Sequence, residues 1–254
     1  MVISFANQKG GVGKTTSAIN VASALGSLGK KVLLCDMDPQ SNASSGVGLK
    51  KQDATVSVYD VLIGRNEPQE VIVRTNYKNL WLLPANIELA GAEIELVEEE
   101  AAIRVSRLKN AFDKVMQDYD YIIVDCPPSL GILTLNSLNA SDYVIVTMQC
   151  EYFALEGLTQ LTNTLGRIKK VYNPKIELGG IIITMYDGRL NLTSQVLDEL
   201  KKYFPDKIFK TPVPRTVRLS EAPSYGMPIN YYDKNSKATD SYLEIAKEIM
   251  QKIK

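Results

Sequence analysis

Short apolar runs alternate with segments of helical spacing along nearly the whole chain. The apolar runs are β-prone and lie at residues 2–6, 31–36, 70–74, 79–83, 121–125, 143–148 and 178–184. Helical spacing of apolar residues occurs at 14–28, 57–63, 87–100, 103–116, 155–171, 192–203 and 237–253. Strands that are apolar at almost every position are typical of parallel sheets covered on both faces. The alternation predicts an α/β fold with a doubly wound, mostly parallel sheet flanked by helices.

The chain has 254 residues, which is the upper end of the size of one α/β domain. Neither a linker rich in Gly, Ser or Pro nor an internal repeat interrupts it, so we expect a single domain over residues 1–254. No apolar run approaches the ~18 residues needed to span a bilayer. The first residues lack the basic and apolar regions of a signal peptide. We therefore expect a cytoplasmic protein.

The cysteine and histidine content limits which catalytic and metal-binding sites the chain can form. Cys35, Cys126 and Cys150 each fall at the end of a predicted strand and share no Cys-x-x-Cys spacing. We expect buried, reduced thiols at all three positions. The chain contains no histidine, which excludes histidine base catalysis and histidine-ligated metals.

Charge is balanced overall but not along the chain. The formal net charge is zero, which argues against a general nucleic-acid binder. Residues 165–254 nevertheless hold 16 Lys and Arg against 10 Asp and Glu, whereas residues 1–164 hold 13 against 19. This asymmetry fits either a localised basic face or lysines scattered over solvated helices. Charge alone does not choose between the two.

A glycine-rich loop separates the first predicted strand from the first predicted helix. Such a loop points consecutive backbone N–H groups inward, and the helix N-terminus adds about half a positive charge, so a polyphosphate is the expected ligand. We expect Lys14 to reach the β- and γ-phosphates and Thr15 to hold Mg²⁺. The predicted nucleotide-binding residues of the loop are Lys9, Gly10, Gly11, Val12, Gly13, Lys14, Thr15 and Thr16.

Two further strands each deliver an aspartate to the carboxyl edge of the predicted sheet, where ligands bind in open α/β folds. Asp36 and Asp38 follow the second strand, and the polar residues 41–48 after them suggest a loop that can move. Asp125 ends another apolar strand and is followed by two prolines. This is a Walker B pattern, in which the carboxylate holds the hydrated Mg²⁺.

The loop departs from the strict phosphate-loop pattern, because Gln8 stands where that pattern has glycine and Lys9 adds a second lysine. In this it resembles the deviant Walker A motif of the ParA/MinD class of ATPases. The wider resemblance is to the Soj/ParA chromosome-partitioning ATPases, of the short chromosomal type because the first strand begins at residue 2. It is carried by residues 9–16, 36–40 with Asn42, 90–96, 125–130, 151–157, 184–187, 214–215 and 217–224.

The resemblance implies a DNA-partitioning cycle. Such proteins bind ATP, pair as a nucleotide sandwich homodimer, and bind double-stranded DNA without sequence preference in that state. They release it after hydrolysis stimulated by a ParB-like centromere-binding protein, are nucleoid-associated, and in some relatives act on a replication initiator. Chromosome and plasmid cargo are both compatible with this sequence.

The resemblance also assigns roles to individual residues. Lys9 would cross to the partner subunit, Lys14 would bind phosphate, and Asp38 would orient the attacking water. Thr15 and Asp125 would hold the metal, and Arg189 and Arg218 would contact DNA. The residues expected near adenine are Met185, Pro212, Val213 and Pro214. One departure is Thr216, where the family usually has asparagine, and it puts the adenine contact at that position in question.

These roles have physical consequences. An aspartate such as Asp38 is a weak base near neutral pH, so turnover should be slow until a partner improves the geometry. Two arginines per subunit give about four in a dimer, which predicts a slope of roughly −3.6 for log K against log salt concentration. DNA affinity should therefore depend on dimerisation, and hence on ATP.

Three rival interpretations share parts of the pattern. A MinD-like membrane-associated positioning ATPase would use the helix at 237–253 as a basic amphipathic anchor, although packing against the protein body is the simpler expectation for its apolar stripe. An iron–sulfur ATPase would need surface cysteines paired across a dimer. An ATP-dependent small-molecule ligase of the same fold would be indifferent to DNA.

Overall fold

We describe the protein from a computed structural model, which covers residues 1–152 and 154–253. Over these residues one seven-stranded sheet has the order β3-β4-β2-β5-β1-β6-β7. All neighbouring strands are parallel except the edge pair β3 and β4, which confirms the predicted fold class. The strands are β1 (Val2–Ala6), β2 (Val32–Asp36), β3 (Val73–Arg74), β4 (Leu80–Leu83), β5 (Tyr121–Asp125), β6 (Tyr143–Met148) and β7 (Glu177–Ile183).

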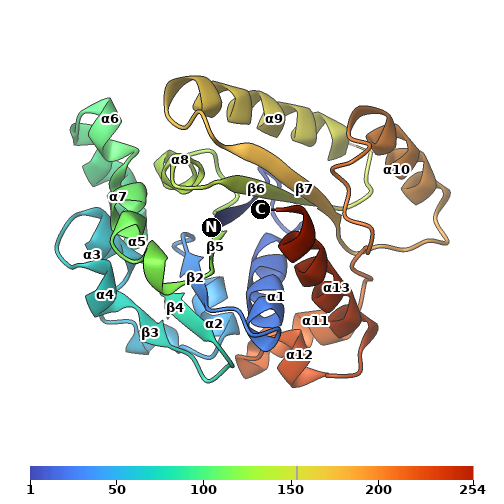
Figure 1. Cartoon of the computed structure of the whole chain (residues 1–254), viewed down its shortest axis with the longest axis horizontal. Coiled ribbons are helices and arrows are strands. Elements are labelled where there is room, and N and C mark those ends of the chain that lie inside the picture. Colours follow the sequence, from blue (N-terminus) through green and yellow to red (C-terminus); the bar gives the residue numbers. More distant parts are fainter. Residues whose placement is uncertain (153, 254) are drawn as a thin grey trace.

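Helices cover both faces of this sheet (Figure 1). The longer ones are α1 (Lys14–Ser27), α5 (Leu89–Glu95), α7 (Arg107–Asp113), α8 (Ile132–Asn139), α9 (Ala154–Val171), α10 (Asn191–Tyr203) and α13 (Lys237–Lys252). The short α-helices are α2 (Asn42–Gly46), α3 (Val58–Leu62), α4 (Pro68–Val71), α6 (Ala101–Arg104), α11 (Val217–Glu221) and α12 (Ile229–Tyr232). The 3₁₀ turns are η1 (Lys51–Asp53), η2 (Leu96–Glu98), η3 (Met116–Asp118) and η4 (Ala222–Tyr225).

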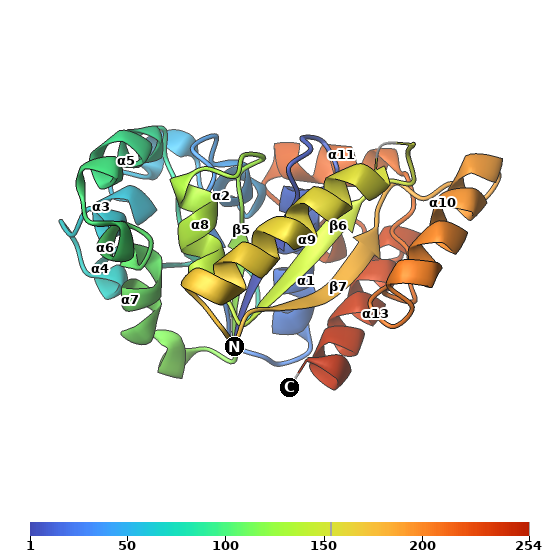
Figure 2. The same cartoon turned by 90° about the horizontal axis from the view of Figure 1, so that it is seen from above.

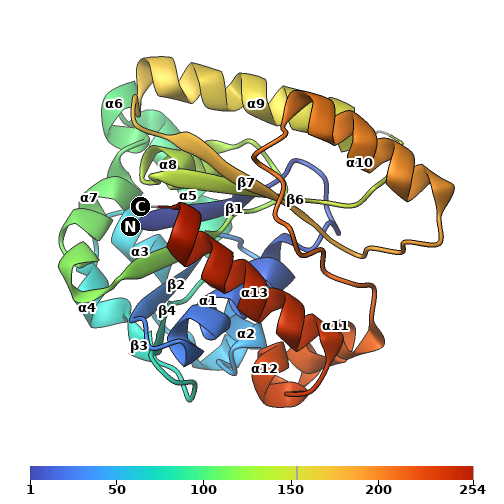
Figure 3. The same cartoon turned by 45° about the vertical axis from the view of Figure 1, so that its right-hand side comes forward.

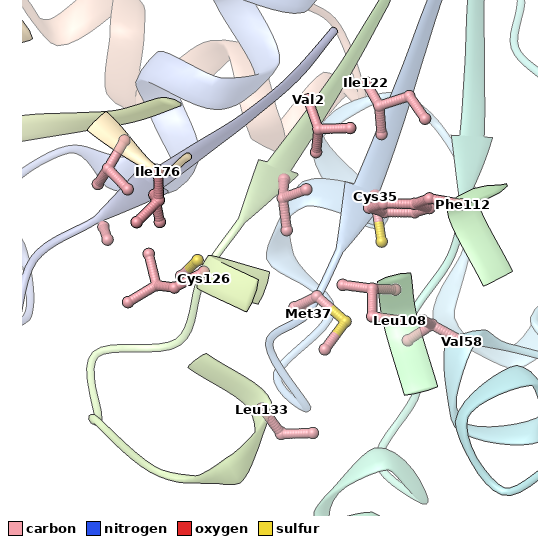
Figure 4. Packing of buried hydrophobic residues seen from close by; sticks show 14 of the residues in the cluster. Val2, Cys35, Met37, Val58, Leu108, Phe112, Ile122, Cys126, Leu133 and Ile176 are labelled. Carbon is pink, nitrogen blue, oxygen red and sulfur yellow. The ribbon is translucent and has the colours of Figure 1, made fainter. Parts of the chain in front are cut away.

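The core consists of two apolar layers, one on each face of the sheet. Successive strand residues point to opposite faces, so Leu33 and Cys35 enter one layer while Val32 and Leu34 enter the other. Figure 4 shows the first layer, where Cys35 and Met37 pack with residues of the helices α7 and α8. Burial on both faces explains why these strands are apolar at almost every position.

The last helix, α13, packs along α1 (Figure 3). Its buried stripe includes Ala246 and Ile249, and Ile253 just after it is buried as well. The stripe predicted at 237–253 therefore belongs to the second core layer, and the structure gives the membrane-anchor interpretation no free apolar face on this helix. No helix in the described residues combines the length and the apolar character that crossing a membrane requires.

Four local predictions are wrong, and one helix was not predicted. The strand predicted at 70–74 is only Val73–Arg74, because Pro68 and a capping pair between Glu67 and Glu70 form a helical turn first. Residues 41–48, predicted as a loop, contain the helix α2. The helix predicted at 87–100 ends its α-helical part at residue 95, and that predicted at 103–116 is broken between α6 and α7. No helix was predicted at 132–139, where α8 lies.

Cys35 and Cys126 are buried free thiols, as predicted. The prediction is wrong for Cys150, which is a free thiol but only half-buried, because it lies in the segment after β6 rather than within the sheet.

The amino ends and the carboxyl ends of the parallel strands have different surroundings (Figure 2). The strand β1 begins near both chain termini, whereas α5 and α11 lie at the opposite edge, together with the carboxyl ends of the parallel strands. The strand β1 sits between β5 and β6, so the sheet grows in opposite directions from this point. Ligands of open α/β sheets bind at such a switch point, outside the carboxyl ends.

Candidate functional site

The glycine-rich loop lies at this switch point, between β1 and α1. Gly11 and Gly13 have φ angles of 73° and 82°, a left-handed conformation that glycine adopts without a Cβ penalty. Gly13 is the N-cap of α1. A Cβ at Gly13 would lie 3.4 Å from the side chain of Thr184, so the loop also fits closely against the end of β7.

Two side chains that directly follow the strands β6 and β7 fix the loop backbone. The Gln149 Nε2 donates to the Gly11 carbonyl at 2.9 Å, and the Thr184 Oγ1 donates to the Val12 carbonyl at 2.8 Å. Both side chains bind carbonyl oxygens, so neither of them occupies an N–H group of the loop. This is the arrangement that a phosphate-binding loop requires.

Lys14 points inward across the loop. Its side chain is buried, and the Nζ donates to the Lys9 carbonyl at 3.0 Å. Burial lowers the pKa of Lys14, and the negative charge of Asp125 partly offsets this. The amine is therefore held ready beside the loop by a single backbone contact, which a phosphate oxygen can replace.

Lys9 points outward from the same loop. Its backbone N–H donates to Asn7 Oδ1 at 3.0 Å, and its ammonium forms an ion pair with Glu151, which follows β6. The Lys9 side chain is 54% exposed. The two lysines of the loop thus occupy opposite environments.

Asp125 is the most unusual group in the site. It is fully buried at the end of β5, and neither carboxylate oxygen has a hydrogen-bond partner among the described residues. Burial raises its pKa well above the ordinary value, and the charge of Asp36 raises it further. The Thr15 hydroxyl is near enough to lower that pKa but does not complete a hydrogen bond. A buried carboxylate without a partner beside a hydroxyl is an oxygen set that fits Mg²⁺.

Asp36 and Asp38 take different roles at the end of β2. The Asp36 Oδ2 accepts from both the N–H and the hydroxyl of Ser44, each at 2.8 Å, so Asp36 anchors α2. Burial raises the pKa of Asp36 to about 6, against these hydrogen bonds. The Asp36 Oδ1 also accepts from the Asp38 N–H, so both Asp36 oxygens are occupied. The Asp38 Oδ1 accepts from the Gln40 N–H at 2.9 Å. Of the two carboxylates after β2, Asp38 is therefore the one that can offer an oxygen, Oδ2, to a ligand.

A pocket of about 280 Å³ opens beside the loop. Of the four residues predicted to lie near adenine, Met185, Val213 and Pro214 line this pocket. The carbonyl oxygen of the fourth, Pro212, accepts from the Ser241 hydroxyl. Met185 has a φ of 50°, an uncommon conformation for a residue with a side chain. The remaining lining residues are Gly13, Thr16, Thr184, Arg215, Thr216, Leu219, Ser220, Pro223 and Tyr242.

Known proteins share this architecture. A family model described as an AAA domain matches residues 1–178. The sporulation initiation inhibitor protein Soj of Bacillus subtilis is 52% identical over 248 residues, which are 98% of this chain and 97% of that protein. The chromosome partitioning protein ParA of Myxococcus xanthus is 48% identical over 99% of this chain and 88% of its own length.

The chain belongs to the Soj/ParA family of chromosome-partitioning ATPases. Among solved structures, a cobyrinic acid a,c-diamide synthase from Mycobacterium smegmatis with bound ATP analogue and magnesium has a TM-score of 0.88 and 38% identity, over 98% of this chain and 94% of that one. The predicted family and the P-loop fold are therefore confirmed.

In this Soj/ParA chain, Thr216 has a structural role that explains why threonine can replace the usual asparagine at this position. It is the N-cap of α11, and its hydroxyl accepts from the backbone N–H of Arg218 at 3.3 Å. Threonine is a favourable N-cap residue, as asparagine is. The substitution therefore preserves the start of this helix while changing one wall of the pocket.

The two arginines predicted to contact DNA are exposed but not unpaired. The Arg189 guanidinium holds Asp187 through two bonds, at 2.9 and 2.7 Å, and lowers the pKa of that carboxyl to about 2. Arg218 lies 3.3 Å from Glu221 and 3.6 Å from Asp233. Each arginine is thus partly neutralised by carboxylates of its own chain.

Sequence reasoning missed several contributors to the site. One is Glu151, whose pairing with Lys9 joins positions 142 apart in the sequence. Glu151 belongs to the segment 151–157, in which Phe153 is outside the described residues. The anchoring role of Asp36 was also missed. A usable signal existed for Thr184, which directly follows the apolar run of β7 at the carboxyl edge.

Proposed function

We propose that this chain is an ATP-driven molecular switch for DNA partitioning. It binds Mg²⁺-ATP, pairs as a homodimer, binds DNA without sequence preference in that state, and hydrolyses ATP slowly until a ParB-like protein stimulates it. One observation carries the proposal most directly. A single loop presents one lysine to its own nucleotide site and a second lysine outward, next to a buried carboxylate that fits Mg²⁺.

The inward half of the site holds the nucleotide. Lys14 exchanges the Lys9 carbonyl for phosphate oxygens, and the N–H groups of the loop bind the same phosphates. Thr15 and Asp125 hold Mg²⁺, which when bound neutralises phosphate charge during phosphoryl transfer. The relatives support this cofactor, since a solved structure 38% identical to this chain contains an ATP analogue and magnesium.

The outward half is completed by a second subunit. Lys9 leaves Glu151 and contacts the nucleotide of the partner, where it adds positive charge beside the transferred phosphate. An exposed ion pair such as Lys9–Glu151 is worth only about 0–1 kcal/mol, so the exchange is inexpensive. Asp38 positions the attacking water through the oxygen that Gln40 does not occupy.

DNA binding follows from dimerisation. Arg189 and Arg218 each exchange a carboxylate of their own chain for a DNA phosphate. The two arginines of one subunit release few counterions from DNA. A dimer places twice as many arginines on the same duplex and so binds it more tightly. DNA affinity therefore depends on ATP.

A second candidate function is ATP-dependent synthesis on a small molecule. It is favoured by the 38% identity to the solved structure of a cobyrinic acid a,c-diamide synthase. The two functions differ in their response to DNA. A partitioning ATPase hydrolyses ATP faster with DNA and its ParB-like partner, whereas a synthase is indifferent to both.

The proposal is tested by measuring mass in solution and hydrolysis together. Light scattering with Mg²⁺-ATP should give a dimer for the wild type and a monomer for Lys9→Ala, and both should be monomers with ADP. Hydrolysis should rise when DNA and the ParB-like protein are added. A wild-type chain that stays monomeric with ATP, or whose hydrolysis ignores both additions, would overturn the proposal.

A further inference from the structure

The segment from residue 87 to residue 103 has a second apolar face that the fold leaves uncovered. Leu89, Ala92 and Leu96 are buried, and they attach this segment to the body. At about 100° per helical residue, Ile94 lies on the other side of α5 from Ala92 and Leu96. The exposed apolar residues are Ile87 (75% exposed), Ile94 (74%), Val97 (58%) and Ile103 (46%), and we refer to these four as the apolar ridge.

Glutamates are interleaved with the apolar ridge along the sequence. Residues 87–104 contain six glutamates and a single arginine. Glu99 is paired with Arg107, and Glu95 accepts from the Tyr59 hydroxyl. No ion pair of the described residues includes the remaining glutamates of this segment, which are Glu88, Glu93, Glu98 and Glu100. The exposed surface of this segment therefore combines apolar and negatively charged side chains, and we refer to these four glutamates as the glutamate rim.

The segment that carries the apolar ridge also reaches both loops that handle the nucleotide. A Cβ at Gly131 would lie 2.5 Å from the Glu93 carboxylate, so Glu93 lies against the end of the loop that follows Asp125. At the other end, Ile87 lines a pocket of about 410 Å³ with Pro39 and Gln40, directly after Asp38. In Figure 2, α5 lies at the carboxyl edge of the sheet, on the same edge as these loops.

We propose that the apolar ridge and its glutamate rim are the docking site for a cationic, amphipathic segment of the partner protein that stimulates hydrolysis. Apolar side chains of that segment cover Ile94 and Val97, and its Lys or Arg residues pair with Glu98 and Glu100. Docking shifts Glu93 and Ile87, which changes the positions of the loops after Asp125 and Asp38. This inference rests on the proposed function, because it assumes that a stimulating partner exists.

Charge selects this occupant over two others. In a symmetric contact between two copies of this chain, the same surface meets itself, so the glutamate rims would face each other and repel. Anionic lipid headgroups would be repelled in the same way. A positively charged polypeptide is the occupant whose charge matches.

The test uses the full chain with Mg²⁺-ATP and DNA, titrated with the ParB-like protein while direct binding and hydrolysis are both followed. The variants are Ile94→Ser/Val97→Ser and Glu98→Lys/Glu100→Lys, all at exposed positions. Their matched controls are Val171→Ser, at an apolar residue that is 68% exposed on α9, and Asp206→Lys, at an exposed acidic residue. We expect the ridge variants to need about tenfold more partner for half-maximal stimulation, with unstimulated hydrolysis within about twofold of wild type. Both controls should behave as wild type.

Two results would overturn the assignment of the ridge alone. One is wild-type stimulation and binding in both ridge variants. The other is loss of the ATP-dependent dimer in Ile94→Ser/Val97→Ser, since that would make the ridge a contact between subunits. A wild-type chain that neither binds the ParB-like protein nor responds to it would overturn the proposed function, and the docking site with it.

Discussion

The inward and outward cations of this protein differ in what they need to act. Lys14 is buried and held by a backbone carbonyl, next to Asp125. Lys9, Arg189 and Arg218 are exposed and rest on carboxylates of their own chain. The inward site is assembled by the fold alone. Each outward cation is paired with a carboxylate that, in the proposed cycle, a second molecule displaces.

This difference suggests how one chain couples two binding events. Burying a charge costs several kcal/mol unless it is compensated, so Asp125 and Lys14 favour a ligand that brings opposite charges. Exposed pairs are worth about 0–1 kcal/mol, so the outward cations exchange partners readily. Nucleotide binding thus contributes the larger part of the binding free energy, and the exchange of the exposed ion pairs contributes the smaller part.

The largest expected effect is at the inward lysine. Lys14→Ala should lower ATP affinity by about a hundredfold, because a charged hydrogen bond in a buried site is lost. Isothermal titration with Mg²⁺-ATP measures this, and Lys109→Ala, at an exposed lysine, is the control. Equal affinities for the two variants would mean that the inward site does not hold the phosphates.

Asp125→Asn should separate stability from function. Without nucleotide and with EDTA, the variant should be more stable at neutral pH by about 1–2 kcal/mol, since it removes a buried carboxylate that has no partner. Hydrolysis should nevertheless be lost. Urea unfolding checks the stability, and a destabilised variant would contradict the account.

The pH dependence has a definite sign. Because the pKa of Asp125 in the folded chain lies well above 3.8, the folded state keeps a proton that the unfolded state releases. The free energy of unfolding should therefore fall as pH rises above 3.8 in the wild type. This part of the fall should be absent in Asp125→Asn.

Among the outward cations, Glu151→Gln should free Lys9. We expect ATP-dependent dimerisation to tighten by about two- to fivefold, in line with the loss of one exposed ion pair. Sedimentation at several protein concentrations measures it. Glu156→Gln, at an exposed residue of α9, is the control and should not change dimerisation.

The smallest effect concerns Arg189, which is proposed to contact DNA. Asp187→Asn should increase the affinity for random DNA by about twofold, because Arg189 loses its ion-pair partner. The pairing itself is visible by NMR. The pKa of the Asp187 carboxyl should be about 2 in the wild type and should rise in Arg189→Ala, and an unchanged value would show that the pair does not form in solution.

Much of this could be predicted from the sequence because its causes are local. Strands buried on both faces leave continuous apolar runs, and the phosphate loop is read from consecutive residues around Gly11 and Gly13. The pairing of Lys9 with Glu151 could not be predicted, since it joins two loops through the tertiary fold. The helix α2 was missed because its anchor is the buried Asp36 rather than its own polar sequence.

The ridge at 87–103 illustrates the same limit. Its apolar residues fit a helix with one buried face, and only the structure separates the buried Leu96 from the exposed Ile94. The single-domain prediction and the roles of Arg189 and Arg218 remain predictions.

DNA binding at several salt concentrations tests the central claim most directly, that the outward cations act only when a second subunit completes them. Affinity for a random duplex is measured with a non-hydrolysable ATP analogue and with ADP, for the wild type and Arg189→Ala/Arg218→Ala. The account predicts binding with the ATP analogue alone, a slope of roughly −3.6 for log K against log salt concentration, and loss of both in the double variant. Equal binding with ADP, or an unchanged slope in the double variant, would contradict it.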